Sequence, residues 1–228
     1  MRRRRTALPA LVVGAIALGA VLTSAPASAA TLGSTVPAAT AGEACTPGTR
    51  VFTPEAPPAL ALLGAEDANR VATGRGVVVA VVDSGIDAGN PHLAGVVIGG
   101  VDLVGDGERA DGLSDTTGHG TAIAGQIAAQ PVDGSGVVGL APDARLLSVR
   151  VFRSNQQQDK DKGFGPTSQR IADGIHWAAD NGADIINVSI SQETDSPDLR
   201  AAVEHASAVG ALVLSLIHIS EPTRLLSI

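Results

Sequence analysis

From Pro58 onward, short continuous apolar runs alternate with segments in which apolar residues recur every three or four positions. The runs are rich in Val, Ile and Leu and have no polar face, as expected of strands that are covered on both sides in a parallel sheet. The pattern predicts five strands, which span residues 77–82, 96–101, 146–152, 184–188 and 211–214.

The segments between these runs predict helices. Residues 60–71 carry an amphipathic pattern that a Gly-Arg-Gly segment ends, and residues 119–129 predict a helix of very small side chains. Ser168 is the predicted cap of a third helix, which stops at an Asn-Gly pair, and a fourth helix opens at Ser196. Strands that alternate with helices indicate βαβ units. The predicted fold is therefore a three-layer α/β structure with a mostly parallel central sheet flanked by helices.

The N-terminus predicts an export signal over residues 1–29. Four consecutive arginines precede an apolar stretch from Leu11 to Leu22, and an Ala-Ser-Ala cleavage site follows. The alternative, a membrane anchor, needs about 20 apolar residues, and this stretch is shorter. We therefore expect a secreted or cell-surface protein. Residues 30–57 are rich in Pro, Thr and Ala and are predicted to be an N-terminal extension of low order.

The net charge and the single cysteine reduce the number of possible functions. The net charge is −7, and without the arginine-bearing first 30 residues it is −11, from 12 bases against 23 acids. Such an acidic surface repels phosphate backbones, which argues against nucleic-acid binding. Cys45 is the single cysteine, and no Cys-His signature or lipidation pattern surrounds it. We interpret it as half of a disulfide whose partner lies outside this chain.

The first candidate for chemistry is Asp83, which ends the predicted strand 77–82 and is followed by Ser84 and Gly85. An acidic residue at the carboxyl end of a central parallel strand lies where α/β folds place ligands and catalytic groups. By itself this position is compatible with a phosphoacceptor, a magnesium ligand, a carboxylate that orients a catalytic base, or an aspartate that caps a turn.

The second candidate is His119, which opens a predicted helix and lies between Gly118 and Gly120. The small neighbours allow close packing of the backbone, and the helix N-terminus disfavours an extra proton on the imidazole, so the ring is suited to act as a base. An isolated histidine is more often structural. Its occurrence 36 positions after the Asp83 segment, each in a specific context, favours a catalytic pair.

These segments resemble the aspartate and histidine motifs of the subtilase family of serine proteases. Asp83-Ser84-Gly85 and His119-Gly120-Thr121 carry the resemblance, and three structural segments agree, at 139–151, 168–178 and 185–191. The resemblance covers residues 58–214. The signal sequence and the extension with Cys45-Thr46-Pro47 are similar to the mycosin branch of that family, which accompanies type VII secretion.

The resemblance implies a serine endopeptidase with an Asp-His-Ser triad. In such a triad His119 would be the general base, Asp83 would orient it, and polypeptides would be the substrates. Two extended edges would bind the substrate, one at Gly163, Phe164 and Gly165 and the other at Ser189, Ile190 and Ser191. Ser191 stands where the family has Gly. The chemistry requires no cofactor, and the resemblance leaves open structural calcium and a membrane helix beyond this chain.

The end of the sequence departs from the family. After the strand at 211–214 a subtilase has a Gly-Asn pair and later a Gly-Thr-Ser with the nucleophile, and neither follows here. Residues 215–228 resemble a translated sequencing adapter, so we interpret them as a non-native tail and residues 58–214 as the front part of a peptidase domain. The alternatives are a catalytically dead peptide-binding pseudoprotease and a phosphoryl-transfer domain. The second alternative would require a phosphate-binding glycine loop, which this sequence does not contain.

Overall fold

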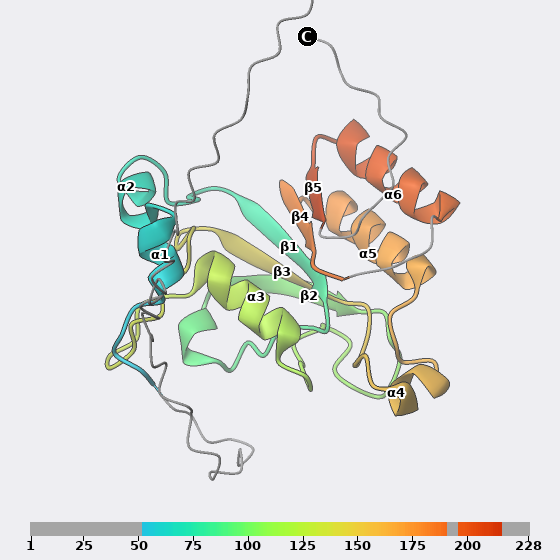
Figure 1. The fold of residues 1–228 in the computed structure, drawn as a ribbon. Coiled ribbons are helices and arrows are strands. Elements are labelled where there is room, and N and C mark those ends of the chain that lie inside the picture. The colour runs from blue at the N-terminus through green and yellow to red at the C-terminus, as the bar shows by residue number, and fades with distance from the viewer. Residues whose placement is uncertain (1–51, 191–195, 216–228) are drawn as a thin grey trace, which may run out of the picture. The chain divides into compact units, whose positions relative to one another are not determined.

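A computed structural model describes residues 52–190 and 196–215. Within these residues the strands form a five-stranded sheet in the order β2-β3-β1-β4-β5, and every neighbouring pair is parallel (Figure 1). The strands are β1 (Val78–Asp83), β2 (Val97–Asp102), β3 (Arg145–Arg150), β4 (Ile185–Val188) and β5 (Leu212–Ser215). The predicted α/β fold with a parallel sheet is confirmed.

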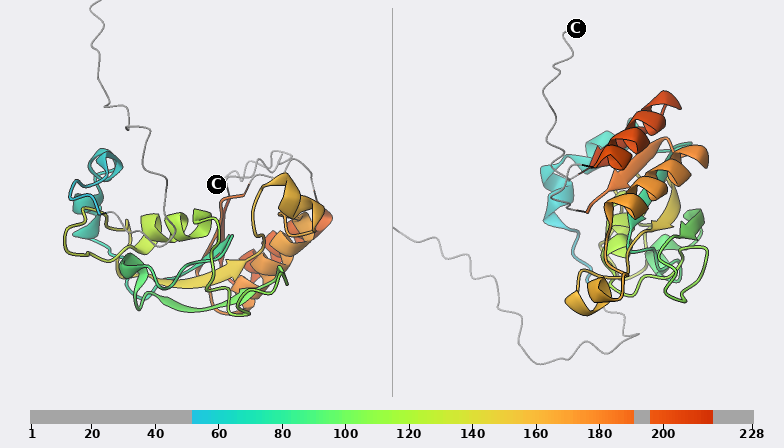
Figure 2. Two further views of the ribbon diagram at one scale, coloured as in Figure 1. Left: turned by 90° about the horizontal axis from the view of Figure 1, so that it is seen from below. Right: turned by 90° about the vertical axis from the view of Figure 1, so that its right-hand side faces the viewer.

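Helices cover the two faces of this sheet (Figure 2). Helix α3 (His119–Ala128) lies on one face, while α5 (Ser168–Asp180) and α6 (Pro197–Ala208) lie on the other. The shorter elements are α1 (Pro58–Leu62), α2 (Ala65–Asn69), α4 (Gln157–Asp161) and a 3₁₀ turn at Pro91–Leu93. The sheet is thus the middle of three layers.

Alternation along the central strand β1 explains its continuous apolar sequence. Ala80 and Val82 pack into the core beneath α5 and α6, while Val79 and Val81 pack into the core beneath α3. Successive side chains of a strand point to opposite faces, so a strand that is covered twice needs apolar residues at every position.

The structure corrects two details of the predicted helices. The helix expected over 60–71 is two short helices, because Gly64 between them adopts a left-handed conformation with φ of 63°. The cap of α5 is Thr167 rather than Ser168, since the Thr167 hydroxyl accepts a hydrogen bond from the Arg170 amide at 3.2 Å. Helix α4 and the 3₁₀ turn carry no clear periodicity and were not predicted.

Several predicted features lie outside the described residues. They are the export signal at 1–29, the extension up to residue 51 with Cys45, Ser191, and the predicted tail at 215–228 except for Ser215, which is the last residue of β5 and is paired with Val188. The last part of the extension is described, and the Thr53 carbonyl accepts a hydrogen bond from the Gly136 amide at 2.8 Å. Among the described helices, none combines the length and the apolar character needed to cross a bilayer.

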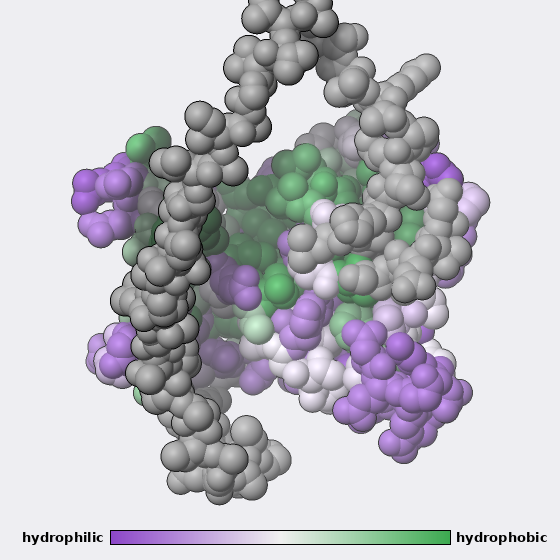
Figure 3. All heavy atoms as spheres, viewed as in Figure 1, coloured by the Kyte–Doolittle hydropathy of each residue, from purple (hydrophilic) through white to green (hydrophobic). Residues whose placement is uncertain are grey.

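The α3 face of the sheet is incompletely covered by the described residues. Helix α3 packs on β1 and β3, whereas Leu212 and Leu214 of β5 are 56% and 48% exposed. In the view of Figure 3, hydrophobic residues gather in the middle of the molecule. The described residues therefore leave apolar side chains of β5 exposed on this face.

Candidate active site

The fold brings Asp83 and His119 together at the carboxyl edge of the sheet. Asp83 is the last residue of β1 and His119 is the first residue of α3. The imidazole Nδ1 lies 2.7 Å from Oδ1 of the Asp83 carboxylate. Both residues therefore meet where parallel α/β sheets gather their functional groups.

The two partners differ in exposure. The Asp83 side chain is fully buried, while the His119 side chain is 50% exposed. Oδ1 of Asp83 also accepts the Ser84 amide at 2.7 Å, and Oδ2 has no hydrogen-bond partner among the described residues. Burial raises the pKa of the Asp83 carboxyl, and the hydrogen bond from His119 offsets part of that rise. When Nδ1 donates to the carboxylate, the neutral imidazole keeps Nε2 as its acceptor.

Glycines allow the backbones of the two elements to approach closely. A Cβ on Gly120 would lie well within 3.0 Å of the Gly85 carbonyl oxygen, and one on Gly85 would similarly meet the Ser114 carbonyl oxygen. Gly85 also has a φ of 103°, which disfavours any other residue. The start of α3 at Gly120 and the exit of β1 at Gly85 thus each require a residue without a side chain.

Two charged residues next to the pair were missed in the sequence. Asp115 precedes α3 and accepts hydrogen bonds from both Ser84 and Thr121. Arg150 ends β3, directly beside Asp83 in the sheet register, and pairs with Asp102 and Asp106. For Asp115, the available sequence signal was an acidic residue just before a helix start. For Arg150, the signal was a charge within an otherwise apolar strand.

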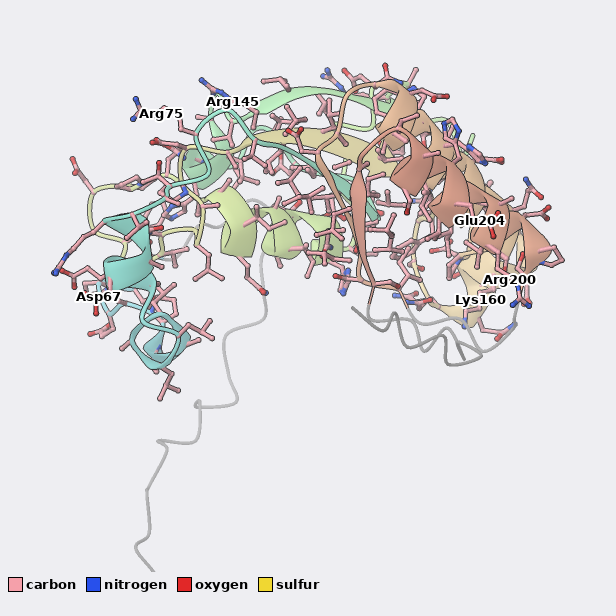
Figure 4. The ribbon with its side chains drawn as sticks, turned by 90° about the horizontal axis from the view of Figure 1, so that it is seen from above. Asp67, Arg75, Arg145, Lys160, Arg200 and Glu204 are labelled. Atoms are coloured by element: carbon pink, nitrogen blue, oxygen red, sulfur yellow. The ribbon has the colours of Figure 1, made fainter. Side chains whose placement is uncertain are left out.

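Other charges lie on the outside of the fold. In Figure 4, Arg75 and Arg145 project near the amino ends of β1 and β3, at the opposite edge of the sheet from Asp83. Lys160 belongs to α4, and Arg200 and Glu204 belong to α6. Among the described residues, Asp83 and Arg150 are both fully buried, and both lie at the carboxyl edge of the sheet.

The predicted substrate edge at Gly163, Phe164 and Gly165 is held by the protein's own groups. Nη2 of Arg170 donates to the carbonyls of Gly163 and Gly165 at 2.7 and 2.6 Å. The Phe164 carbonyl accepts the Arg153 amide, and its own amide donates to the Asp159 carbonyl. A peptide strand at this edge would have to compete with or add to these hydrogen bonds.

The second predicted edge follows β4. Ile190 is buried, and the Ser189 hydroxyl accepts a hydrogen bond from the side-chain amide of Asn187 at 2.9 Å. Ser191 lies outside the described residues. No hydrogen bond among the described residues joins either edge to the Asp83–His119 pair.

An apolar pocket of about 850 Å³ lies beside α3, and its lining includes Asp115 and Thr121. Leu60, Leu63, Gln126 and Leu140 also contribute to its lining, and neither Asp83 nor His119 does.

The described residues contain no group of three or more His, Cys, Asp or Glu side chains arranged to hold a metal ion.

Known proteins with similar sequences are serine proteases, in agreement with the Asp83–His119 pair. A family model described as the subtilase family aligns with residues 74–219. The chain is 39% identical over 142 residues to the "Major intracellular serine protease" of Bacillus subtilis (strain 168), covering 62% of this chain and 42% of that protein. It is 36% identical over 167 residues to "Mycosin-1" of Mycobacterium tuberculosis (strain ATCC 25618 / H37Rv), covering 67% of this chain and 36% of the relative.

Solved structures agree. The structure of MycP1 from the ESX-1 type VII secretion system superposes with a TM-score of 0.59 at 29% sequence identity, covering 75% of this chain and 47% of that one. The chain thus spans less than half the length of the proteins that it matches. The predicted resemblance, including its mycosin-like character, is confirmed.

Proposed function

Because the chain belongs to the subtilase family, we propose that it carries the general base and the orienting carboxylate of a serine endopeptidase. The observation that carries this proposal is the 2.7 Å contact between Nδ1 of His119 and Oδ1 of Asp83. A buried carboxylate that binds one ring nitrogen leaves the other free to accept a proton. The names of the relatives, which are serine proteases, support the same reaction.

The proposed reaction is acyl transfer. Nε2 of His119 takes the proton of a serine hydroxyl while the serine oxygen attacks the peptide carbonyl carbon, and the imidazolium then gives this proton to the leaving amine. Asp83 fixes the ring tautomer and stabilises the imidazolium. A water molecule, deprotonated by the same histidine, hydrolyses the acyl-enzyme. The nucleophilic serine and the oxyanion donors are assigned to sequence outside residues 52–214, and no cofactor takes part.

The test is hydrolysis of peptide substrates by two purified proteins. One is the 228-residue chain, which we expect to be inactive because its sequence contains no Gly-Thr-Ser motif. The other is a chimera in which residues 74–214 replace the matching segment of the Bacillus subtilis relative, which would supply the serine. We expect the chimera to cleave peptides and its His119→Ala variant to lose roughly 10⁶-fold in kcat.

Three possible results would change the proposal. A folded chimera that hydrolyses peptides equally well with and without His119 would contradict the proposed role of the imidazole. If the folded chimera binds peptides tightly but does not cleave them, the alternative of a peptide-binding pseudoprotease is favoured. Hydrolysis by the 228-residue chain that depends on His119 would show that Ser215 or Ser220 is a nucleophile.

We further propose that the protease is exported and acts with type VII secretion machinery. The support is the similarity to Mycosin-1 and to the MycP1 structure from a type VII secretion system, together with the predicted export signal at 1–29. Residues 1–57 fused to alkaline phosphatase should give phosphatase activity outside the cytoplasm. Activity that stays absent although the fusion protein accumulates would contradict export.

A further inference from the structure

The Asp115 carboxylate lies at the centre of a dense set of hydrogen bonds. Its Oδ1 accepts from the Ser84 hydroxyl at 2.9 Å, from the Thr117 amide and hydroxyl at 3.1 and 3.2 Å, and from the Gly118 amide at 2.9 Å. Its Oδ2 accepts from the amide and the hydroxyl of Thr121 at 2.9 and 2.6 Å. One side chain thus binds the exit of β1, the loop before α3 and the first turn of α3.

These contacts lie on both sides of His119 in the chain. Gly118, the residue before it, and Thr121, two residues after it, donate their amides to Asp115. Gly120 donates its amide to the Ser84 hydroxyl at 3.0 Å, and that hydroxyl in turn donates to Asp115. Ser84 directly follows Asp83, which binds the imidazole. The contacts therefore close a ring that runs from Asp83 through Asp115 to His119 and back.

The backbone around His119 has little stiffness of its own. Gly118 and Gly120 flank it, and glycine restricts the backbone least. The N-cap residue of α3 is Gly118, which offers no side chain to bind the free amides of the first turn. Asp115 and Ser84 bind those amides instead. Without these hydrogen bonds, the orientation of the His119 side chain would depend on two flexible glycines, Gly118 and Gly120.

We propose that Asp115 is a positioning residue for the catalytic pair: its carboxylate ties the first turn of α3 to the exit of β1, so that the His119 imidazole meets Asp83 in one orientation. This inference rests on the proposed function of that pair. Asp115 acts through the backbone on both sides of His119, and Ser84 and Thr121 complete the arrangement.

The arrangement requires a carboxylate rather than an amide. Six donors converge on the two oxygens, and an asparagine would place an NH₂ group against some of them. A negative charge is also favourable at the N-terminus of a helix. Burial works to raise the pKa of Asp115, but the hydrogen bonds from Thr121, Ser84 and Gly118 outweigh it and hold the pKa below its ordinary value of 3.8. Asp115 is therefore ionised at neutral pH.

The test is NMR of the 228-residue chain with ¹⁵N-labelled histidine. The proton on Nδ1 of His119 that is hydrogen-bonded to Asp83 gives a far-downfield resonance, which a His119→Gln variant identifies. We expect this resonance to be lost through solvent exchange in Asp115→Asn and in Thr121→Val. It should persist in Thr121→Ser, which keeps the hydroxyl. The matched control is Asp143→Asn, a carboxylate that binds the Thr73 hydroxyl at the opposite edge of the sheet.

A folded Asp115→Asn protein with the parental Nδ1 resonance would overturn the proposal. If that variant loses the amide dispersion of a folded protein, Thr121→Val against Thr121→Ser decides, because only the serine keeps the hydroxyl that donates to Asp115 and accepts from the Asp87 amide. Equal resonances in those two variants would also overturn it. The readout needs neither a serine nucleophile nor a substrate, so a failure of the proposed peptidase activity is distinguishable from a failure of this inference.

Discussion

Two hydrogen-bonded sets of side chains lie side by side at the carboxyl edge of the sheet and differ in exposure and in geometry. Asp83 ends β1 and Arg150 ends β3, and the two residues are partners in the strand register. Asp83 binds a half-exposed imidazole through one oxygen. Arg150 is fully buried and binds Asp106 through two nitrogens at 2.8 Å, and Asp102 at 3.0 Å.

The difference separates a pair arranged for chemistry from a pair arranged for structure. Burial raises the pKa of Asp83, so keeping that carboxylate charged costs folding free energy. The hydrogen bond from Arg150 lowers the pKa of Asp106, so the fold gains from its charge. A buried pair with bidentate geometry holds loops in place, whereas an exposed imidazole on a buried carboxylate is free to exchange a proton. Four experiments test this division.

The largest expected effect is on catalysis by the Asp83 pair. In the peptidase chimera, Asp83→Asn should reduce kcat roughly 10⁴-fold, because the wrong tautomer of His119 is then favoured. The thermal midpoint at neutral pH should not fall, since the variant removes a buried charge. Peptide hydrolysis and thermal unfolding measure the two effects. If Asp83→Asn lowered the free energy of unfolding by as much as it raised the activation free energy, the contrast with Arg150 would be contradicted.

The Arg150 pair should behave in the opposite way. Arg150→Met leaves the buried Asp102 without this partner and leaves Asp106 with only Arg153 at 3.3 Å, which should destabilise the chain by about 3–5 kcal/mol in urea unfolding. Arg75→Met is the matched control, because Arg75 forms an exposed ion pair with Asp143. A variant of Arg150 that is as stable as this control would show that the buried cluster does not hold the loops.

An intermediate effect is expected where β1 and α3 touch. Gly120→Ala forces a Cβ against the Gly85 carbonyl oxygen, so the start of α3 must move. We expect a loss of about 1–3 kcal/mol and of the Nδ1 proton resonance of His119. Gly125→Ala, on the same helix, meets nothing within 4 Å and should be neutral or stabilising. Equal stability of the two variants would contradict the close approach.

The smallest effect is a dependence on acid. Because the folded pKa of Asp106 lies below its ordinary value of 3.8, its stabilising contribution is complete above that pH and is lost as the pH falls through the folded value. The parent should therefore lose stability more steeply below pH 3.8 than Asp106→Asn does. Thermal midpoints measured over a pH series check the difference in slope. Parallel curves for the two proteins would refute the assignment.

Much of the fold could be predicted because its signals are local. A strand that is covered on both faces needs an unbroken apolar run, and all five runs became strands within one or two residues of their predicted limits. Asp83 and His119 stood out for the same reason, since each lies at the end of an element with a glycine one or two residues away. The limits of this approach appear at Gly64, whose left-handed conformation ended a helix that the apolar pattern alone would continue.

The sequence by itself determined the layers of this protein, the order of its elements and the two residues of the proposed catalytic pair. Only the tertiary structure decided which of its many charged residues are buried and what they bind. Ser84 lies 31 positions from Asp115, and Asp106 lies 44 positions from Arg150. Such pairs are set by how the loops between β2 and α3 fold over the sheet edge. Periodicity reports the environment of a residue along its own element, and it carries no information on which distant group that residue will meet.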